Sequence, residues 1–269
     1  MSQNAFQYSI LASGSTGNAF YLETPTKKLL VDAGLSSKKI TDLLHDIGRD
    51  PKELDAIFVT HEHVDHIHGV GVLARKHGTS VYANDKTWEA MAAKVGDIPL
   101  DQRHHFERGT TLTFGDIDIE SFGVSHDAVD PQFYRFMKDG KSFVLLTDTG
   151  YVSDKLVSHI ADSDAYLIEA NHDLEILRHG SYSWHLKQRI LSDIGHLSNE
   201  AGADAVIRSS GNRTKAVYLG HLSQENNNKE IAHLTVTQEL EAADIHVGTD
   251  ILLCETFADR PTPLRDIDQ

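Results

Sequence analysis

Short apolar runs separated by polar turns recur along the chain and predict strands. In the first sixty residues they cover 8–12, 19–23, 28–32 and 56–60. Between the last two runs, apolar residues recur at helical spacing, which predicts a helix over 36–48 that Gly48 can end. Further strand-like runs cover 111–114, 116–124, 132–137, 142–147, 216–221 and 250–255. Helical patterns alternate with the later strands, so the chain reads as an α/β protein.

Two segments of the chain share one pattern. Residues 29–63 and 145–173 each read as a strand, Asp-x-Gly, a helix, and a second strand that follows Asp-Ala and leads to histidine. A third strand, 216–221, also ends in histidine. The pattern predicts two sheets packed face to face, with helices outside and ligands gathered where strands end. No linker-like segment interrupts the chain, so we expect one domain over 1–269.

The composition limits the cellular location and the binding partners that we expect for the protein. Hydrophobic residues make up 40% of the chain, and none of their runs is long enough to cross a membrane. Cys254 is the one cysteine, which excludes an internal disulfide and favours a cytoplasmic location. A net charge of −15 disfavours indiscriminate nucleic-acid binding but allows a local basic surface.

The run His-Glu-His-Val-Asp-His at 61–66 carries the strongest chemical signal. His61 and His63 lie two residues apart, so in an extended loop their rings can face one ion, while Asp65 and His66 can reach a second ion nearby. Imidazole and carboxylate ligands suit Zn, Mn or Fe. A chance run of histidines in a polar loop is the alternative. The buried-type strand before the run disfavours that alternative.

Three more polar residues follow predicted strands and supply candidate ligands. They are His126, Asp148 and His221. Asp148 can bridge two ions because a carboxylate has two oxygens. Each of the three residues alone would be an ordinary loop residue, but together they predict a metal centre that holds two divalent ions.

These motifs resemble the five ordered motifs of the metallo-β-lactamase fold, over residues 10 to about 255. The matching elements are Asp32 in LLVDAG, HEHVDH, His126, Asp148 in TDTG, and His221 in LGHLS. The resemblance implies a four-layer αβ/βα sandwich with two metal ions in an edge cleft. One ion would be held by His61, His63, His126 and Asp148. The other would be held by Asp65, His66, Asp148 and His221. Asp32 would support the ligand loop from behind.

Residues 190–206 resemble the nuclease branch of this fold that includes the tRNA 3′-processing enzymes. The match implies that His196 donates a proton to the leaving oxygen or steadies the scissile phosphate. Asp65 would orient or deprotonate the attacking water. The alternative is that His196 only caps a helix beginning near Ser198.

More widely, the chain resembles the YycJ group, also called WalJ or VicX, of Gram-positive bacteria. The shared segments are LASGSTGNA, THEHVDHIHGV, SHDAVDP, LLTDTG, EANHD, SDIGHLSN and GHLSQENN. The resemblance implies a 5′→3′ exonuclease on double-stranded DNA, with a functional link to a two-component cell-wall regulatory system.

Other residues are candidates for substrate contact. Ser13, Ser15 and Asn18 lie in a turn-prone segment that can cradle a phosphate or form a plain hairpin turn. His172 occupies, through the repeat, the place of the 61/63 histidines, and either lines the cleft or is a vestige. Segment 174–193 mixes aromatic residues with the basic side chains Arg178, Lys187 and Arg189. It predicts a DNA-contacting surface, or else an amphipathic helix with Trp184, Leu186 and Ile190 in the core.

The residues leave several functions open. An RNA-processing endonuclease, a small-molecule phosphodiesterase and a thioesterase would use the same metal centre. A thioesterase would not need the basic segment. A metal-containing regulatory partner without catalysis would not need an intact hydrolytic set, which this chain has. The native metal, the cleavage polarity and the oligomeric state are not fixed by the sequence.

Overall fold

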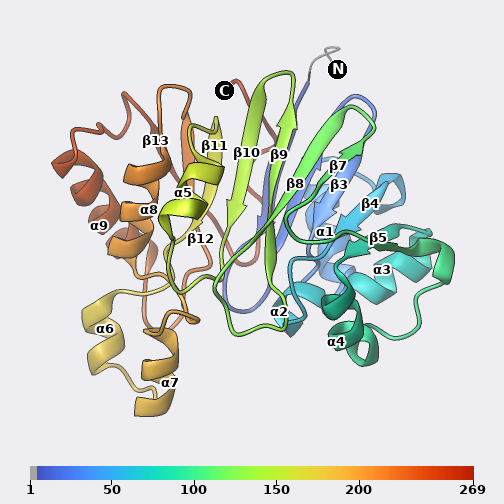
Figure 1. Ribbon diagram of the computed structural model, residues 1–269, viewed down its shortest axis with the longest axis horizontal. Helices are drawn as coiled ribbons and strands as arrows, with labels where there is room; N and C mark the ends of the chain where they lie inside the picture. The colour runs from blue at the N-terminus through green and yellow to red at the C-terminus, as the bar shows by residue number, and fades with distance from the viewer. Residues whose placement is uncertain (1–4) are drawn as a thin grey trace.

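Two seven-stranded sheets packed face to face form the centre of the computed structural model, which describes residues 5–269 (Figure 1). The first sheet has the order β14-β1-β2-β3-β4-β5-β6. Its strands are β1 (Gln7–Ala12), β2 (Ala19–Glu23), β3 (Lys28–Val31), β4 (Ala56–Phe58), β5 (Ser80–Ala83), β6 (Arg103–His105) and β14 (Arg265–Asp266). Strands β1, β2 and β3 pair antiparallel, and β3 to β6 pair parallel.

The second sheet repeats this plan in the order β13-β12-β11-β10-β9-β8-β7. Its strands are β7 (Thr111–Phe114), β8 (Ile117–Gly123), β9 (Gln132–Lys138), β10 (Lys141–Leu146), β11 (Ala165–Glu169), β12 (Ala216–Gly220) and β13 (Leu252–Glu255). Strands β7 to β10 pair antiparallel, and β10 to β13 pair parallel. The predicted fold class, with its two similar halves, is therefore confirmed.

Alternating side chains of the first sheet face two different apolar cores. In β2, Phe20 and Leu22 pack between the sheets, whereas Tyr21 packs with the helices outside. In β4, Phe58 faces inward and Ile57 outward. Successive side chains of a strand point to opposite faces, so a strand covered on both sides is apolar throughout. This explains why these segments appear in the sequence as unbroken apolar runs.

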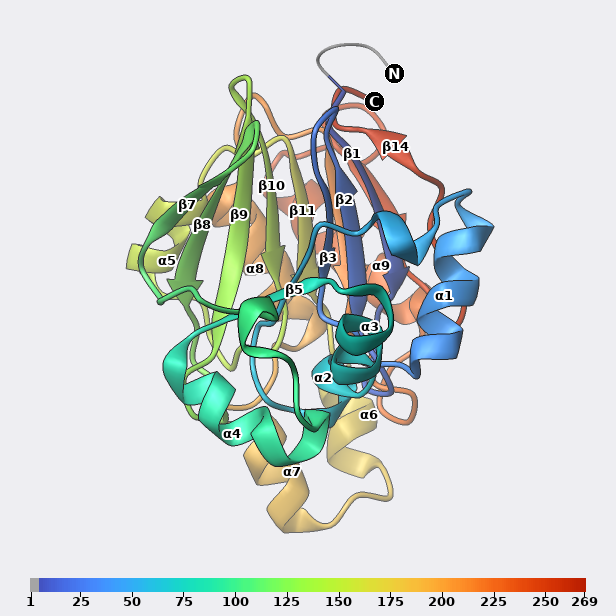
Figure 2. The ribbon, with the colours of Figure 1, turned by 90° about the vertical axis from the view of Figure 1, so that its right-hand side faces the viewer.

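Helices cover the outer faces of both sheets (Figures 1 and 2). The first sheet is covered by α1 (Ser37–Asp46), α3 (Val70–His77) and α4 (Asp85–Val95). The second is covered by α5 (Asp154–Ile160), α8 (Asn199–Ser209) and α9 (Lys229–Ala242). Short elements are α2 (Val64–Ile67), α6 (Leu174–His179), α7 (Trp184–Ile190) and the 3₁₀ turns Pro51–Glu53 and Leu100–Gln102. Helices α6 and α7 project beyond one end of the sandwich in both views. Within residues 5–269, every helix is too short or too polar to span a bilayer.

Local details differ from the sequence expectations at three places. Asp65 and His66 lie in the single turn of α2, which begins after His63, and not in an extended loop. Segment 174–193 forms two short helices joined by a turn, rather than the one amphipathic helix of the second alternative. Trp184, expected in a core under that alternative, is 65% exposed, although Ile190 is buried. The third difference is at Ser198, whose own side chain caps α8, so His196 is not the cap.

A glycine lets the loop after β3 lie against the backbone of α2. A Cβ built on Gly34 would lie 1.6 Å from the carbonyl oxygen of Asp65. The amide of Ala33 donates to the carbonyl of His66 at 2.8 Å, and the amide of Asn18 donates to that of Asp65 at 2.9 Å. These bonds fix the backbone of two candidate ligands. Gly150 is the equivalent glycine of the second half, and a Cβ built on it would lie 2.1 Å from the carbonyl oxygen of Asp193.

We expect the Gly34→Ala variant to lose both stability and metal binding. The added methyl group must displace α2, at a cost of about 3 kcal/mol, and Asp65 and His66 move with it. Gly78→Ala is the matched control, because Gly78 has φ of +71° with open space around its Cβ position. That variant should lose about 1 kcal/mol through backbone strain alone. Thermal unfolding and metal content measure the two effects. Full metal content in Gly34→Ala would contradict this account.

Candidate metal centre

The candidate ligands lie close together, and several of them line a cleft beside α7. Helices α6 and α7 project from this end of the sandwich (Figure 1). The candidate ligands follow the carboxyl ends of strands in both sheets, where neighbouring strand ends bring loops together. Three of the residues after strands have left-handed backbones: Asp32 with φ of 58°, Asp148 with 50° and His221 with 54°. Non-glycine residues seldom adopt this conformation, and it concentrates at functional sites. It turns the chain sharply at the strand end.

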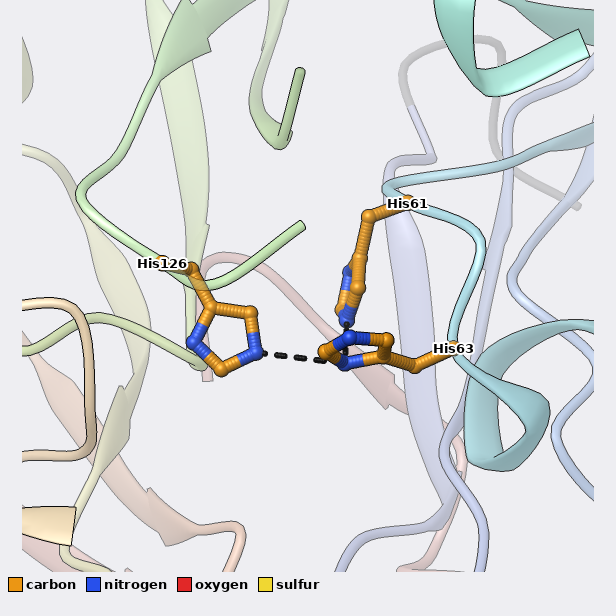
Figure 3. Close-up of side chains that lie close together, drawn as sticks. All are labelled: His61, His63 and His126. Carbon is orange, nitrogen blue, oxygen red and sulfur yellow. Dashed lines mark hydrogen bonds between the residues drawn. The ribbon is translucent and has the colours of Figure 1, made fainter. Parts of the chain in front are cut away.

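Three histidines from both sheets form one part of the centre (Figure 3). His61 Nε2 lies 3.1 Å from His63 Nδ1, which lies 3.3 Å from His126 Nε2. A tetrahedral zinc ion with Zn–N bonds of 2.0–2.1 Å separates its nitrogen ligands by about 3.3–3.4 Å. The spacing of these imidazoles is therefore that of ligands to a shared ion.

Hydrogen bonds on the far sides of two of the rings orient them. Thr60 Oγ1 donates to Asp32 at 2.7 Å and lies 3.0 Å from His61 Nδ1, so that nitrogen carries the proton and donates. His126 Nδ1 donates to the carbonyl of Gly195 at 3.2 Å. Burial, with neighbouring histidines, also lowers the pKa of His61 well below its usual value. Both rings thus present an unprotonated Nε2, the form that binds a metal.

The second part of the centre contains Asp65, His66, Asp148 and His221. His66 Nε2 lies 3.3 Å from Asp148 Oδ2 and 3.6 Å from Asp65 Oδ2. His221 Nε2 lies 3.6 Å from the same Asp65 oxygen. Asp148 also lies 3.8 Å from His126, through its other oxygen. Asp148 therefore lies between the two groups, as expected of a bridging carboxylate.

The chemistry of this donor set fits divalent cations. Asp148 Oδ2 and His221 Nε2 are buried without a hydrogen-bond partner. A buried polar atom without a partner is costly, and a cation ligated by these atoms would remove that cost. Burial raises the pKa of Asp148, but His221 and His66 hold it well below its usual value, so the carboxylate is charged. All seven predicted ligands come together in overlapping groups of three or four.

Asp32 lies behind His66, as expected from its motif. Its carboxylate accepts from the Thr60 amide at 2.8 Å and lies 2.7 Å from His66 Nδ1. It is 2% exposed and lies outside the groups that could hold an ion. Asp32 therefore orients His66 and leaves the other ring nitrogen facing Asp148.

Glu169 is a site residue that the sequence analysis missed. Its Oε1 accepts from His196 Nδ1 at 2.7 Å and from His221 Nδ1 at 3.0 Å, and its Oε2 accepts from the Thr149 amide at 2.9 Å. Burial raises the pKa of this carboxyl, but His196 and His221 lower it to about 2. The charged carboxylate therefore fixes both rings. Its position as the last residue of β11 is the signal that could have found it, because that rule found Asp148 and His221.

Ser13, Ser15 and Asn18, the candidates near the N-terminus, lie in different positions relative to the metal centre. Ser15 lines the cleft, a cavity of about 250 Å³ over the metal centre. Asn18 is buried, with its amide nitrogen 3.2 Å from His66 Nε2 and 3.5 Å from Asp65 Oδ2. Ser13 accepts from the His221 amide at 2.8 Å and is 5% exposed. Ser13 and Asn18 thus support ligands, and Ser15 alone of the three lines the cleft.

The three basic candidates, Arg178, Lys187 and Arg189, lie in different environments. Arg189 lines the cleft together with Tyr182 and pairs with Asp127, whose Oδ1 lies 3.4 Å from His126 Nε2. Lys187 is buried, and its ammonium donates to the carbonyls of Arg178 and Gly180 at 2.8 and 2.7 Å. Those bonds hold the α6–α7 turn, so Lys187 does not face the cleft.

Arg178 and His172 lie outside the cleft lining. Arg178 pairs with Glu175 on the surface of α6 at 2.8 Å. His172 is 1% exposed, and neither ring nitrogen has a hydrogen-bond partner. Burial lowers its pKa to about 4, so the ring is neutral. His172 therefore does not line the cleft, which leaves the alternative that it is a vestige of the repeat.

Comparisons with known proteins agree with this geometry. Residues 27–222 match the model of the beta-lactamase superfamily domain. The chain is 67% identical to exodeoxyribonuclease WalJ of Streptococcus pneumoniae serotype 2, over 99% of this chain and 100% of that protein. It is 49% identical to exodeoxyribonuclease YycJ of Bacillus anthracis, over 96% and 98%. The metallo-beta-lactamase fold protein YhfI of Bacillus subtilis has the same fold, with a TM-score of 0.70, 17% identity, and coverage of 96% and 99%.

We expect added Zn²⁺ or Mn²⁺ to raise the unfolding temperature of metal-stripped protein, because an ion that binds only the folded state stabilises it.

Asp32→Asn should weaken metal binding about 10- to 100-fold. The side-chain amide has one acceptor oxygen where the carboxylate has two, so it cannot accept from both the Thr60 amide and His66 Nδ1. Asp55→Asn is the matched control, since Asp55 accepts from the Lys28 amide far from the ligands. Metal titration followed by unfolding measures all three proteins. Equal affinities would refute the role of Asp32.

Proposed function

The chain belongs to the beta-lactamase superfamily and, within it, to the family of the WalJ and YycJ proteins, and from that premise we propose that it is a metal-dependent exodeoxyribonuclease. The substrate we propose is double-stranded DNA, degraded from its 5′ ends. One observation carries the proposal. Seven candidate ligands cluster beneath a cleft that also exposes Asp65 and His196, in a chain 67% identical to a named exodeoxyribonuclease.

Two divalent ions, Zn or Mn, are the proposed cofactors. His61, His63, His126 and Asp148 would hold one, and Asp65, His66, Asp148 and His221 the other. When bound, such a pair would lower the pKa of water and would neutralise charge on the phosphoryl oxygens. The remaining chemistry rests on the side chains around them.

Asp65 is proposed to orient or deprotonate the attacking water. Burial raises its pKa, but His66 and His221 lower it below the usual value, so the carboxylate is charged and can accept a hydrogen bond from the water. The side-chain amide of Asn18 donates to Asp65 Oδ2 at 3.5 Å. The carboxylate lines the cleft, within reach of a substrate.

His196 is the proposed donor of a proton to the leaving sugar oxygen. Because its Nδ1 donates to Glu169 at 2.7 Å, its Nε2 stays available for the substrate. Its ring centroid lies 5.2 Å from that of His126 and 5.1 Å from that of His221, at the edge of the metal cluster.

The cleft favours one nucleic-acid strand at a time. Its volume of about 250 Å³ is small, and Tyr182, Leu186 and Arg189 of the projecting segment form one wall. An aromatic ring and a guanidinium beside a metal centre suit a base and a phosphate. A thioester substrate would need neither the aromatic ring nor the guanidinium.

The setting of this activity is also a proposal. A cytoplasmic location agrees with a DNA substrate and with the one cysteine, Cys254. A functional link to a two-component cell-wall regulatory system rests on the family resemblance alone.

A nuclease assay with Mn²⁺ or Zn²⁺ tests the proposal. We expect purified protein to shorten a linear duplex from its 5′ ends and to leave closed circular DNA and single-stranded RNA intact. Asp65→Asn and His196→Ala should each lower the rate by at least about 100-fold, the usual effect of losing a general acid or base. Circular dichroism and metal content show that each variant is folded and loaded.

Other substrates decide between the alternatives. Cleavage of RNA would favour an RNA-processing enzyme. Turnover of a small phosphodiester or thioester without cleavage of any nucleic acid would overturn the DNA substrate and keep the metal centre. Unchanged rates in the two variants would remove the roles given to Asp65 and His196.

A further inference from the structure

A second cavity, of about 690 Å³, lies beside the metal cleft and takes no part in the chemistry above. Its walls are the end of β8, the loop before β7, and α5 with the loop before it. Figure 2 shows where these elements lie in the fold. The residues that line it include Arg108, Phe122, Tyr151, Ser153, Lys155 and Leu156. A volume of this size is typical of a site for a small organic ligand.

Two walls of this cavity continue directly into the metal centre. Ser125, in one wall, precedes the candidate ligand His126. Tyr151, in the other wall, follows shortly after Asp148. The amide of Gly150 donates to the carbonyl of Ser125 at 2.9 Å, which joins the two walls. A ligand in the cavity therefore lies next to the metal cleft.

The charge of the cavity is opposite to that of the protein. The chain has a net charge of −15, yet the described residues that line the cavity include Arg108 and Lys155 and no carboxylate. Arg108 pairs with Asp130 at 3.0 Å, outside the lining. Lys155 makes no ion pair with any residue of 5–269. A cationic pocket in an acidic protein favours an anionic ligand.

The remaining lining suits the rest of a nucleotide. Phe122 and Leu156 are buried and give the cavity an apolar floor. Tyr151 is 49% exposed, so its ring is available for stacking on a base. Ser153 accepts from the Leu156 amide at 3.2 Å through its oxygen, which leaves its hydroxyl proton free to donate.

We propose that this cavity binds the 5′-terminal nucleotide of the DNA strand being degraded, with Arg108 and Lys155 on the terminal phosphate and Tyr151 on the base. The inference rests on the proposed exonuclease function and names how that site recognises an end. A cavity of limited size beside the scissile bond accepts one terminal nucleotide, whereas a continuing duplex needs an open groove. The cavity would thus distinguish a DNA end from an internal position.

Two duplexes that differ only in a 5′-phosphate or a 5′-hydroxyl test the proposal. The wild-type protein, loaded with Mn²⁺, should degrade the phosphorylated duplex with a KM about tenfold lower than its KM for the hydroxyl duplex. A tenfold change corresponds to the usual free energy of one hydrogen bond to a charged group. Lys155→Ala and the double variant Arg108→Ala/Lys155→Ala should raise that KM to the value for the hydroxyl duplex, with kcat unchanged. Lys38→Ala, on the exposed surface of α1, is the matched control.

The outcomes of these assays distinguish a failure of the cavity assignment from a failure of the proposed function. Equal KM values for the two duplexes in the wild type, or an equal loss on both duplexes in the variants, would overturn the assignment of the cavity. If the wild type shortens neither duplex, the proposed function itself fails. Because Arg108 pairs with Asp130, the double variant is checked by thermal unfolding, and Lys155→Ala alone carries the test if the double variant unfolds.

Discussion

The burial of many metal-binding side chains at one end of two sheets is the constraint on which the rest of the structure depends. His61, His66, Asp148 and His221 are each at most 2% exposed and lie within a few ångströms of one another. Such a cluster is unfavourable unless each polar atom has a partner. The structure meets this need on the far side of the rings with hydrogen bonds, and leaves the near side for cations.

The two halves of the molecule meet this need in related ways. In the first half, the carboxylate of Asp32 holds His66 from behind. In the second half, the carboxylate of Glu169 holds His196 and His221. Asp148 occupies the place in the repeat that corresponds to Asp32, but it faces the centre of the cluster. One duplicated pattern therefore supplies a supporting carboxylate in one half and a candidate bridging ligand in the other.

Much of this could be predicted from the sequence, because the strands are buried on both faces and stand out as apolar runs. Polar residues that end such runs, such as Asp148 and His221, were found by that position. Burial that depends on distant segments could not be predicted in this way. Lys187 belongs to a basic, aromatic-rich segment, yet its ammonium is held by two carbonyls of its own turn. Arg108 and Lys155 lie far apart in the chain, and only the fold places them in one cavity.

The division of the ligands between the halves has a consequence for the newly made chain. His61 and His66 are synthesised early, whereas His221 follows most of the second sheet and directly precedes the last helix and strands. Neither half alone contains the full set of ligands. A partly translated or truncated polypeptide therefore holds histidines but no complete hydrolytic centre. The candidate ligands therefore come together only when both halves have folded against each other.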